Sequence, residues 1–155
     1  MPEIDSELEL ALNYLDHNKD ESLKRLFDIL KIPSISTQEK YSKDCLNAAN
    51  WFVEQLKDIG FDASIRETNG HPMVVAHFEQ EGPHFLFYGH YDVQPIDPIE
   101  LWNHDPFEPK IEKSHNGEII KARGASDDKG QVMTFIEACR SSLFSLYAIL
   151  TSSGE

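Results

Sequence analysis

The sequence has little cysteine, little positive charge and no long apolar run. Two cysteines, Cys45 and Cys139, among 155 residues make no disulfide framework, so we expect two reduced, buried thiols in a cytoplasmic protein. Lys and Arg number 14 against 27 Asp and Glu, a formal charge of −13. This acidity argues against nucleic acid as a partner, because phosphate binding needs a basic surface. The apolar stretch 143–150 is broken by Ser145 and is too short to span a bilayer. The acidic start, MPEIDSELEL, resembles no secretory signal.

The hydrophobic periodicity predicts helices in the first 60 residues and strands after them. Apolar residues at helical spacing indicate a helix over 43–59, closed by Gly60, and an earlier helix with Asp20 as N-cap that ends before Pro33. Strands are predicted over 61–67, 73–78, 84–88 and 118–122, with a Pro-rich loop over 94–109. A last helix is predicted over about 130–140. This order, in a chain the size of one domain, is typical of a layered α/β fold.

One candidate site follows the apolar stretch FLFY, which we expect to be a core strand, where the sequence continues GHYD. His90 and Asp92 are two residues apart, so in an extended segment both side chains point to the same side. Neutral imidazole is the commonest metal ligand, and a nearby carboxylate commonly holds the other ring nitrogen. The alternative is that His90 and Asp92 merely cap the loop that follows, and the pair alone does not separate the two interpretations.

A second candidate site is Asp127–Asp128 in the stretch ARGASDDKGQ, at a predicted strand-to-helix junction. Adjacent carboxylates repel unless a cation, a helix N-terminus or solvent compensates their charge. Asp is also a favoured N-cap residue, which is the simpler interpretation. Considered together, the two motifs each follow a short strand and offer a histidine and carboxylates. Such donors can hold a pair of zinc ions whose shared water hydrolyses amides.

GHYDVQP, a Trp- and Pro-containing loop and ARGASDDKGQ, in this order, resemble the M20 metallopeptidase family over about residues 23–140. The ending Val93-Gln94-Pro95 is more similar to the carnosinase-like dipeptidase branch than to the desuccinylase branch. The resemblance implies the N-terminal part of a three-layer-type zinc-peptidase catalytic domain, with a mixed sheet flanked by helices.

The resemblance also implies roles for three residues. His90 would bind one zinc ion, Asp127 would bridge both, and Asp92 would be the catalytic acidic residue that orients the imidazole. A cis peptide bond is expected between Asp127 and Asp128. Two zinc ions are implied per complete site, with Mn²⁺ or Co²⁺ as substitutes. Dipeptides or acyl-amino acids are the implied substrates, and the complete enzyme is expected to be a homodimer. Lys129 and Gly130 are expected to support the motif, Lys129 by neutralising a carboxylate.

The family pattern continues with an acidic Gly-Glu-Glu-Glu-like segment that this sequence does not contain. We therefore divide the chain into a family-like portion, 1–140, and a divergent tail, 141–155, as a truncation, a frameshift or a gene-model break would produce. No role is assigned to Glu155. His90 and Asp127 cannot complete two tetrahedral zinc sites, so the chain alone is expected to be an inactive fragment that binds zinc weakly.

Two other functions are considered. A truncated domain without catalysis would act by binding a partner, or have no function. A metal-dependent phosphoesterase would need a further motif such as Gly-Asn-His, whereas Asn103-His104 follows Trp102. The remaining histidines match no motif. His77 and His84 flank a predicted hairpin, and cross-strand surface contacts are expected for them rather than metal binding.

Overall fold

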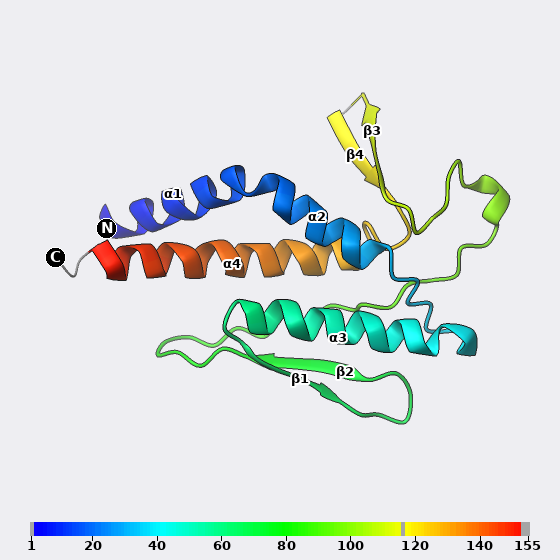
Figure 1. The fold of residues 1–155 in the computed structure, drawn as a ribbon. Helices are drawn as coiled ribbons and strands as arrows, with labels where there is room; N and C mark the ends of the chain where they lie inside the picture. Colours follow the sequence, from blue (N-terminus) through cyan, green and yellow to red (C-terminus); the bar gives the residue numbers. More distant parts are fainter. Residues whose placement is uncertain (1, 116, 153–155) are drawn as a thin grey trace.

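The computed structural model describes residues 2–115 and 117–152 as an α/β fold, which confirms the predicted class (Figure 1). The α-helices are α1 (Pro2–His17), α2 (Lys19–Leu30), α3 (Ser42–Asp58) and α4 (Lys129–Ser152), with short 3₁₀ helices at Glu39–Tyr41 and Ile99–Leu101. The strands are β1 (Asp62–Arg66), β2 (Met73–His77), β3 (Lys110–Ser114) and β4 (Gly117–Lys121). In the described part of the chain, no helix has the length and apolar character needed to cross a membrane.

The core lies where α3 and β1 meet α4. The apolar stripe of α3 contributes Phe52, Val53 and Leu56, all almost fully buried, and Met133 and Ile136 of α4 join the same cluster. Each such side chain contributes about 1.5–3 kcal/mol by leaving water. The predicted helix over 43–59 is confirmed, and Gly60 follows it with φ +93°, a conformation that favours glycine.

The first predicted helix is shifted at its start. Asn18 precedes α2, and Asp20 lies inside its first turn, so the assignment of Asp20 as N-cap is wrong. Asn18 donates its side-chain amide to the carbonyl of Tyr14 at 2.8 Å. It thereby satisfies the end of α1 rather than the start of α2.

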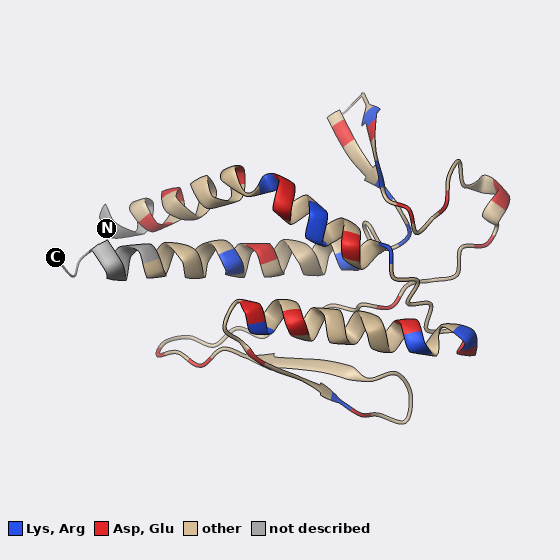
Figure 2. Cartoon of the chain, in the orientation of Figure 1, with Lys and Arg blue, Asp and Glu red and all other residues tan. Residues whose placement is uncertain are grey.

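A charged cluster joins α2 to α4. The guanidinium of Arg25 donates two hydrogen bonds of 2.7 Å to the carboxylate of Glu137, and Ser22 donates a third at 2.8 Å. Glu137 is buried. Desolvation alone would raise its pKa, but the bonds from Arg25 and Ser22 and the charge of Arg25 outweigh this effect and lower it. Elsewhere on α2 and α3, basic residues lie among acidic ones (Figure 2).

The strands pair as two separate hairpins. β1 is antiparallel to β2, and β3 is antiparallel to β4. β1, β2 and β4 confirm predicted strands, whereas β3 was not predicted because the charges of Lys110, Glu112 and Lys113 conceal its alternation. The single mixed sheet is not formed within the described residues, where these four strands give two two-stranded antiparallel sheets.

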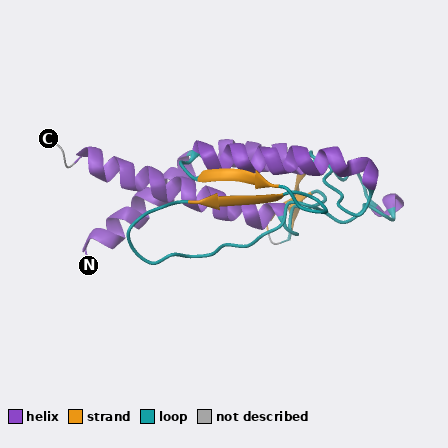
Figure 3. Cartoon of the chain, turned by 90° about the horizontal axis from the view of Figure 1, so that it is seen from below, coloured by secondary structure: helices purple, strands orange, loops and turns teal. Residues whose placement is uncertain are grey.

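The strand predicted over 84–88 is wrong, and so is its place in the core. Figure 3 shows the chain after β2 as a loop, and within the described residues this segment has no ladder partner. Phe85, Leu86 and Tyr88 are 93%, 97% and 85% exposed, while Phe87 stacks on Phe135 of α4 with ring centroids 3.9 Å apart. The residue types favour a strand, but a strand also needs a neighbour with which to pair.

The helix end predicted near residue 140 is also wrong, because α4 continues to Ser152. Residues 141–152 contain neither Gly nor Pro, and the serines among them are compatible with a helix. Ser141 donates its hydroxyl to the carbonyl of Ala138, and Ser145 donates to that of Ser141. Near this end, the rings of Tyr14 in α1 and Phe144 in α4 lie 4.6 Å apart. Glu155 lies outside the described residues.

Candidate metal site

A short parallel contact positions the GHYD segment. Ile35 and Val93 form an isolated parallel bridge. The Val93 amide donates to the Ser34 carbonyl at 2.9 Å, and the Ser34 hydroxyl donates to the Tyr91 carbonyl at 2.7 Å. Ser34 is fully buried. The residues after Pro33 therefore hold in place the backbone segment that carries His90 and Asp92.

The second segment is held where α4 begins. At Gly130, any side chain would place its Cβ 1.9 Å from the carbonyl oxygen of Ala125, so only glycine lets the helix start against this loop. The ammonium of Lys129 is fully buried and donates to the carbonyls of Ile29 and Ile32 at 3.1 and 2.6 Å. Lys129 was expected to neutralise a carboxylate; its hydrogen bonds go instead to carbonyls at and just after the end of α2, and Asp92 and Asp44 act on it only as nearby charges. Burial lowers its pKa to about 7.

Asp128 joins the two segments. Its Oδ2 accepts a hydrogen bond from the His90 amide at 3.0 Å. The approach is close because residue 89 is glycine: a Cβ there would lie 2.5 Å from Val132 Cγ2 and 3.0 Å from the same carboxylate oxygen. The peptide bond between Asp127 and Asp128 is cis, as the resemblance implied.

The structure brings together all three residues predicted for the site. His90 Nδ1 lies 3.0 Å from Asp92 Oδ1 and 3.1 Å from the Asp92 carbonyl, so Nδ1–H is the donor to both. On the opposite side of the ring, Nε2 lies 3.0 Å from Asp127 Oδ1. The side chain of Asp127 is 77% exposed, and that of His90 is 38% exposed. Nε2 and Asp127 therefore meet at a position that solvent can reach.

The pKa of His90 is raised above its ordinary value of 6.5. Burial alone would lower it, but the hydrogen bonds to the Asp92 carbonyl and to the Asp127 carboxylate, with the charges of both residues, outweigh burial. An imidazole nitrogen 3.0 Å from a carboxylate oxygen is stabilised when a proton lies between them. A metal cation can replace that proton, and metal binding then competes with protonation.

The donor set fits part of a zinc site. Imidazole nitrogen and carboxylate oxygen both bind zinc at about 2.0–2.2 Å. A second carboxylate on the distal ring nitrogen is the usual support for such a ligand. His90 and Asp127 supply only two donors, and no cluster of three or more His, Cys, Asp or Glu residues able to hold a metal occurs in the described ranges. The residues present therefore suit a metal without enclosing it.

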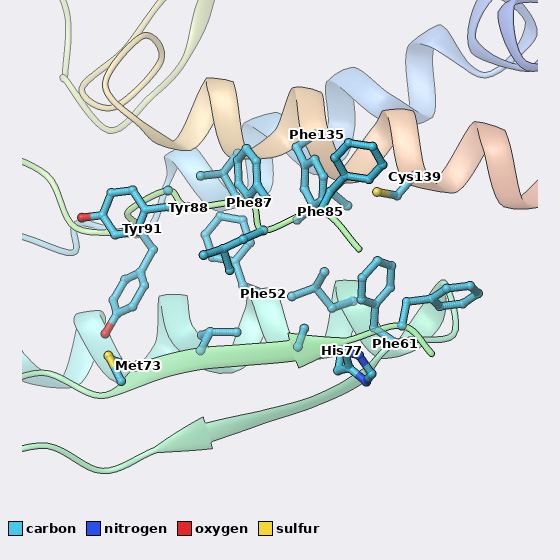
Figure 4. Close-up of a pocket in the computed structure, with 18 of the residues that line it drawn as sticks. Phe52, Phe61, Met73, His77, Phe85, Phe87, Tyr88, Tyr91, Phe135 and Cys139 are labelled. Carbon is cyan, nitrogen blue, oxygen red and sulfur yellow. The ribbon is translucent and has the colours of Figure 1, made fainter. Parts of the chain in front are cut away.

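An apolar cavity of about 820 Å³ adjoins His90 and Asp92. His90 and Asp92 lie on its wall, and the aromatic rings of Phe52, Phe87 and Phe135 line it between α3 and α4 (Figure 4). Exclusion of water by such a lining strengthens electrostatic interactions next to it.

Sequence reasoning missed two polar residues at this site. The hydroxyl of Ser36 donates to Asp92 Oδ2 at 2.5 Å, and His71 Nε2 donates to the Ser36 carbonyl at 2.8 Å. Ser36 follows Ser34 and Ile35 in the stretch PSIS, where serines alternate with apolar residues; nothing comparable in the sequence marks His71. That alternation is the signal that could have placed Ser36 against the site.

The histidines and cysteines considered next lie outside the candidate site. The rings of His77 and His84 stack with centroids 5.8 Å apart, although residue 84 does not belong to a strand and the contact is not cross-strand. His104 contacts the Lys121 carbonyl at 3.2 Å. Cys45 and Cys139 are free, and only Cys45 is buried, so the expectation that both thiols are buried is wrong for Cys139.

Comparison with known proteins supports the resemblance. Residues 86–145 match the family described as Peptidase family M20/M25/M40. The chain is 30% identical over 144 residues to the Cys-Gly metallodipeptidase DUG1 of Candida albicans, covering 83% of this chain and 29% of the relative. It is 37% identical over 86 residues to a succinyl-diaminopimelate desuccinylase of Alkalilimnicola ehrlichii, covering 56% of this chain and 22% of the relative.

Solved structures of two dipeptidases are also similar to this chain. The Saccharomyces cerevisiae di-peptidase Dug1p superposes with a TM-score of 0.77 at 27% identity, covering 90% of this chain and 32% of that protein. Human carnosine dipeptidase 1 superposes with a TM-score of 0.74 at 25% identity, covering 91% and 31%. The chain thus spans about a third or less of the length of these relatives.

Proposed function

Because the chain belongs to peptidase family M20/M25/M40, we propose that it is part of a zinc-dependent hydrolase of dipeptides or related amides. The observation that supports this proposal most directly is the single cluster formed by His90, Asp92 and Asp127, which two distant segments bring together. The relatives that match across most of the chain bear the names of dipeptidases. Dipeptides are therefore the substrates we favour, ahead of acyl-amino acids.

Each residue has a role that its contacts support. His90 would bind a zinc ion through Nε2, because Asp92 engages Nδ1. The exposed carboxylate of Asp127 has a second oxygen available for a second metal ion, as a bridging ligand requires. Zinc, when bound, supplies Lewis acidity that polarises an amide carbonyl and lowers the pKa of water; Mn²⁺ or Co²⁺ would be substitutes. The role of Asp92 is to keep the proton on Nδ1.

We further propose that the 155-residue chain does not hydrolyse peptides by itself. Amide hydrolysis by this chemistry needs a general base near the metal. Asp92 is engaged by His90, Asp128 by the His90 amide, and His90 and Asp127 would be metal ligands. With only these donors, zinc affinity should be low. Assembly of the complete enzyme as a homodimer, a cytoplasmic location, and the division of the chain at residue 140 remain predictions.

Zinc binding by the purified chain tests the proposal. Equilibrium dialysis should show weak zinc binding that His90→Ala and Asp127→Asn abolish. His104→Ala, which removes a histidine whose ring contacts the Lys121 carbonyl, should leave it unchanged. The same preparations should show no dipeptide hydrolysis. Zinc binding insensitive to both site variants would overturn the metal assignment and favour a non-catalytic domain. Hydrolysis by the wild-type chain, lost in His90→Ala, would overturn the proposed inactivity.

A further inference from the structure

The carboxylate of Asp92 is held at both of its oxygens. Oδ1 faces His90 Nδ1 at 3.0 Å, and Oδ2 accepts the hydroxyl of Ser36 at 2.5 Å. The side chain of Asp92 is 37% exposed, so solvent competes for its oxygens. A carboxylate fixed at one oxygen only could turn about its Cβ–Cγ bond. The bond from Ser36 opposes that rotation.

Ser36 is itself fixed by its backbone. The bridge between Ile35 and Val93 sets its register against the Asp92 segment. On its other side, His71 Nε2 donates to the Ser36 carbonyl at 2.8 Å. His71 belongs to the turn between β1 and β2, and its own carbonyl accepts the hydroxyl of Thr68 at 2.7 Å. The β1–β2 turn is thereby tied to the candidate metal site.

We propose that Ser36 is a positioning residue for His90, acting through Asp92. The inference rests on the proposed function, in which His90 Nε2 binds a metal. Ser36 holds Oδ2, so that Oδ1 stays on the Nδ1 proton and the lone pair of Nε2 points to the metal position beside Asp127. Supports of this kind typically change metal affinity by about 10–100-fold when removed.

Nuclear magnetic resonance of the metal-free chain tests this positioning without any activity. The Nδ1 proton of His90, bonded to a carboxylate, should appear far downfield and exchange slowly. Asp92→Asn gives the resonance position for complete loss of the charged acceptor. Ser36→Ala should move the resonance toward that position, and Ser36→Thr, which keeps a hydroxyl, should restore it. Ser141→Ala removes a buried hydroxyl that bonds only within α4 and should change nothing.

If the His90 Nδ1 proton of Ser36→Ala resonates at the wild-type position, the proposal is wrong. It is also wrong if the wild-type chain shows no slowly exchanging Nδ1 proton. If Ser36→Ala does not fold, Ser36→Cys, which retains the volume and a weak donor, takes its place with the same expected shift.

Zinc competition with a chelator provides the second measurement. Ser36→Ala should weaken zinc binding about 10-fold or more relative to the wild type and to Ser36→Thr. Unchanged affinity in Ser36→Ala would overturn the positioning role. If the wild-type chain binds no zinc, the proposed function fails, while the Nδ1 resonance still decides whether Ser36 positions the His90 ring.

Discussion

His90 and Asp127, 37 residues apart in the chain, face each other with 3.0 Å between Nε2 and Oδ1. Asp92 engages the other ring nitrogen, so the imidazole lies between two carboxylates. The parallel bridge at Val93 positions one segment, and the packing of Gly130 against Ala125 positions the other. The site thus depends on two backbone contacts as much as on its side chains.

Asp127→Asn should lower the pKa of His90 in the metal-free chain. The hydrogen bond and charge of Asp127 both favour the imidazolium, and asparagine retains the shape without the charge. Resonances of the His90 ring, followed as a function of pH, measure the change. Asp16→Asn, on the exposed face of α1, is the control. An unchanged pKa in Asp127→Asn would show that Nε2 and Asp127 do not interact in solution.

Zinc binding should weaken as the pH falls. The pKa of His90 is raised, so its proton occupies Nε2 at and below the ordinary value of 6.5 and competes with the metal. Dialysis at a series of pH values should therefore show affinity rising with pH up to the raised pKa and levelling above it. A pH-independent affinity across this window would place the zinc elsewhere.

Local sequence patterns predicted correctly the helices and strands whose hydrogen-bonding partners lie close by in the sequence. The apolar stripe of α3 is sufficient to predict that helix, because a helix satisfies its own backbone hydrogen bonds. β1 and β2 were predictable because a short turn joins each strand to its pairing partner. The segment 84–88 has the same strand-forming residues, but its pairing depends on a neighbour, which local propensity does not encode. Ser36 was missed for a related reason: its partner, Asp92, lies 56 residues away.

Gly89→Ala should destabilise the chain by about 1–3 kcal/mol, the usual cost of overpacking. The added methyl group would lie 2.5 Å from Val132 Cγ2 and press on the Asp128 carboxylate that accepts the His90 amide. Urea denaturation measures the loss. Gly70→Ala is the control, because its new methyl group meets only Thr68 Oγ1, at 3.9 Å. Equal stability of the two variants would contradict the close contact at Gly89.

Glu137→Gln should destabilise the chain by about 3 kcal/mol at neutral pH, because it leaves the largely buried guanidinium of Arg25 without its carboxylate. The pKa of Glu137 is lowered from 4.5, so its contribution is fully present above that value and is lost as the pH falls through the folded-state pKa. The stability difference from wild type should therefore narrow below pH 4.5. Exposed Glu54→Gln should show neither effect; a pH-independent difference for Glu137→Gln would contradict the ion pair.

Leu86→Ser should reduce self-association of the chain without altering its fold. Leu86 is 97% exposed in a loop segment that has no ladder partner in the described ranges, and exposed apolar segments with unpaired backbone associate readily. Its free energy of unfolding should change by less than about 0.5 kcal/mol, as for most exposed positions. Leu101→Ser is the matched control, since Leu101 is 75% exposed but lies in a 3₁₀ helix. Light scattering across a concentration series measures association, and an equal reduction in both variants would show that surface apolarity, rather than the open backbone of residues 84–88, drives it.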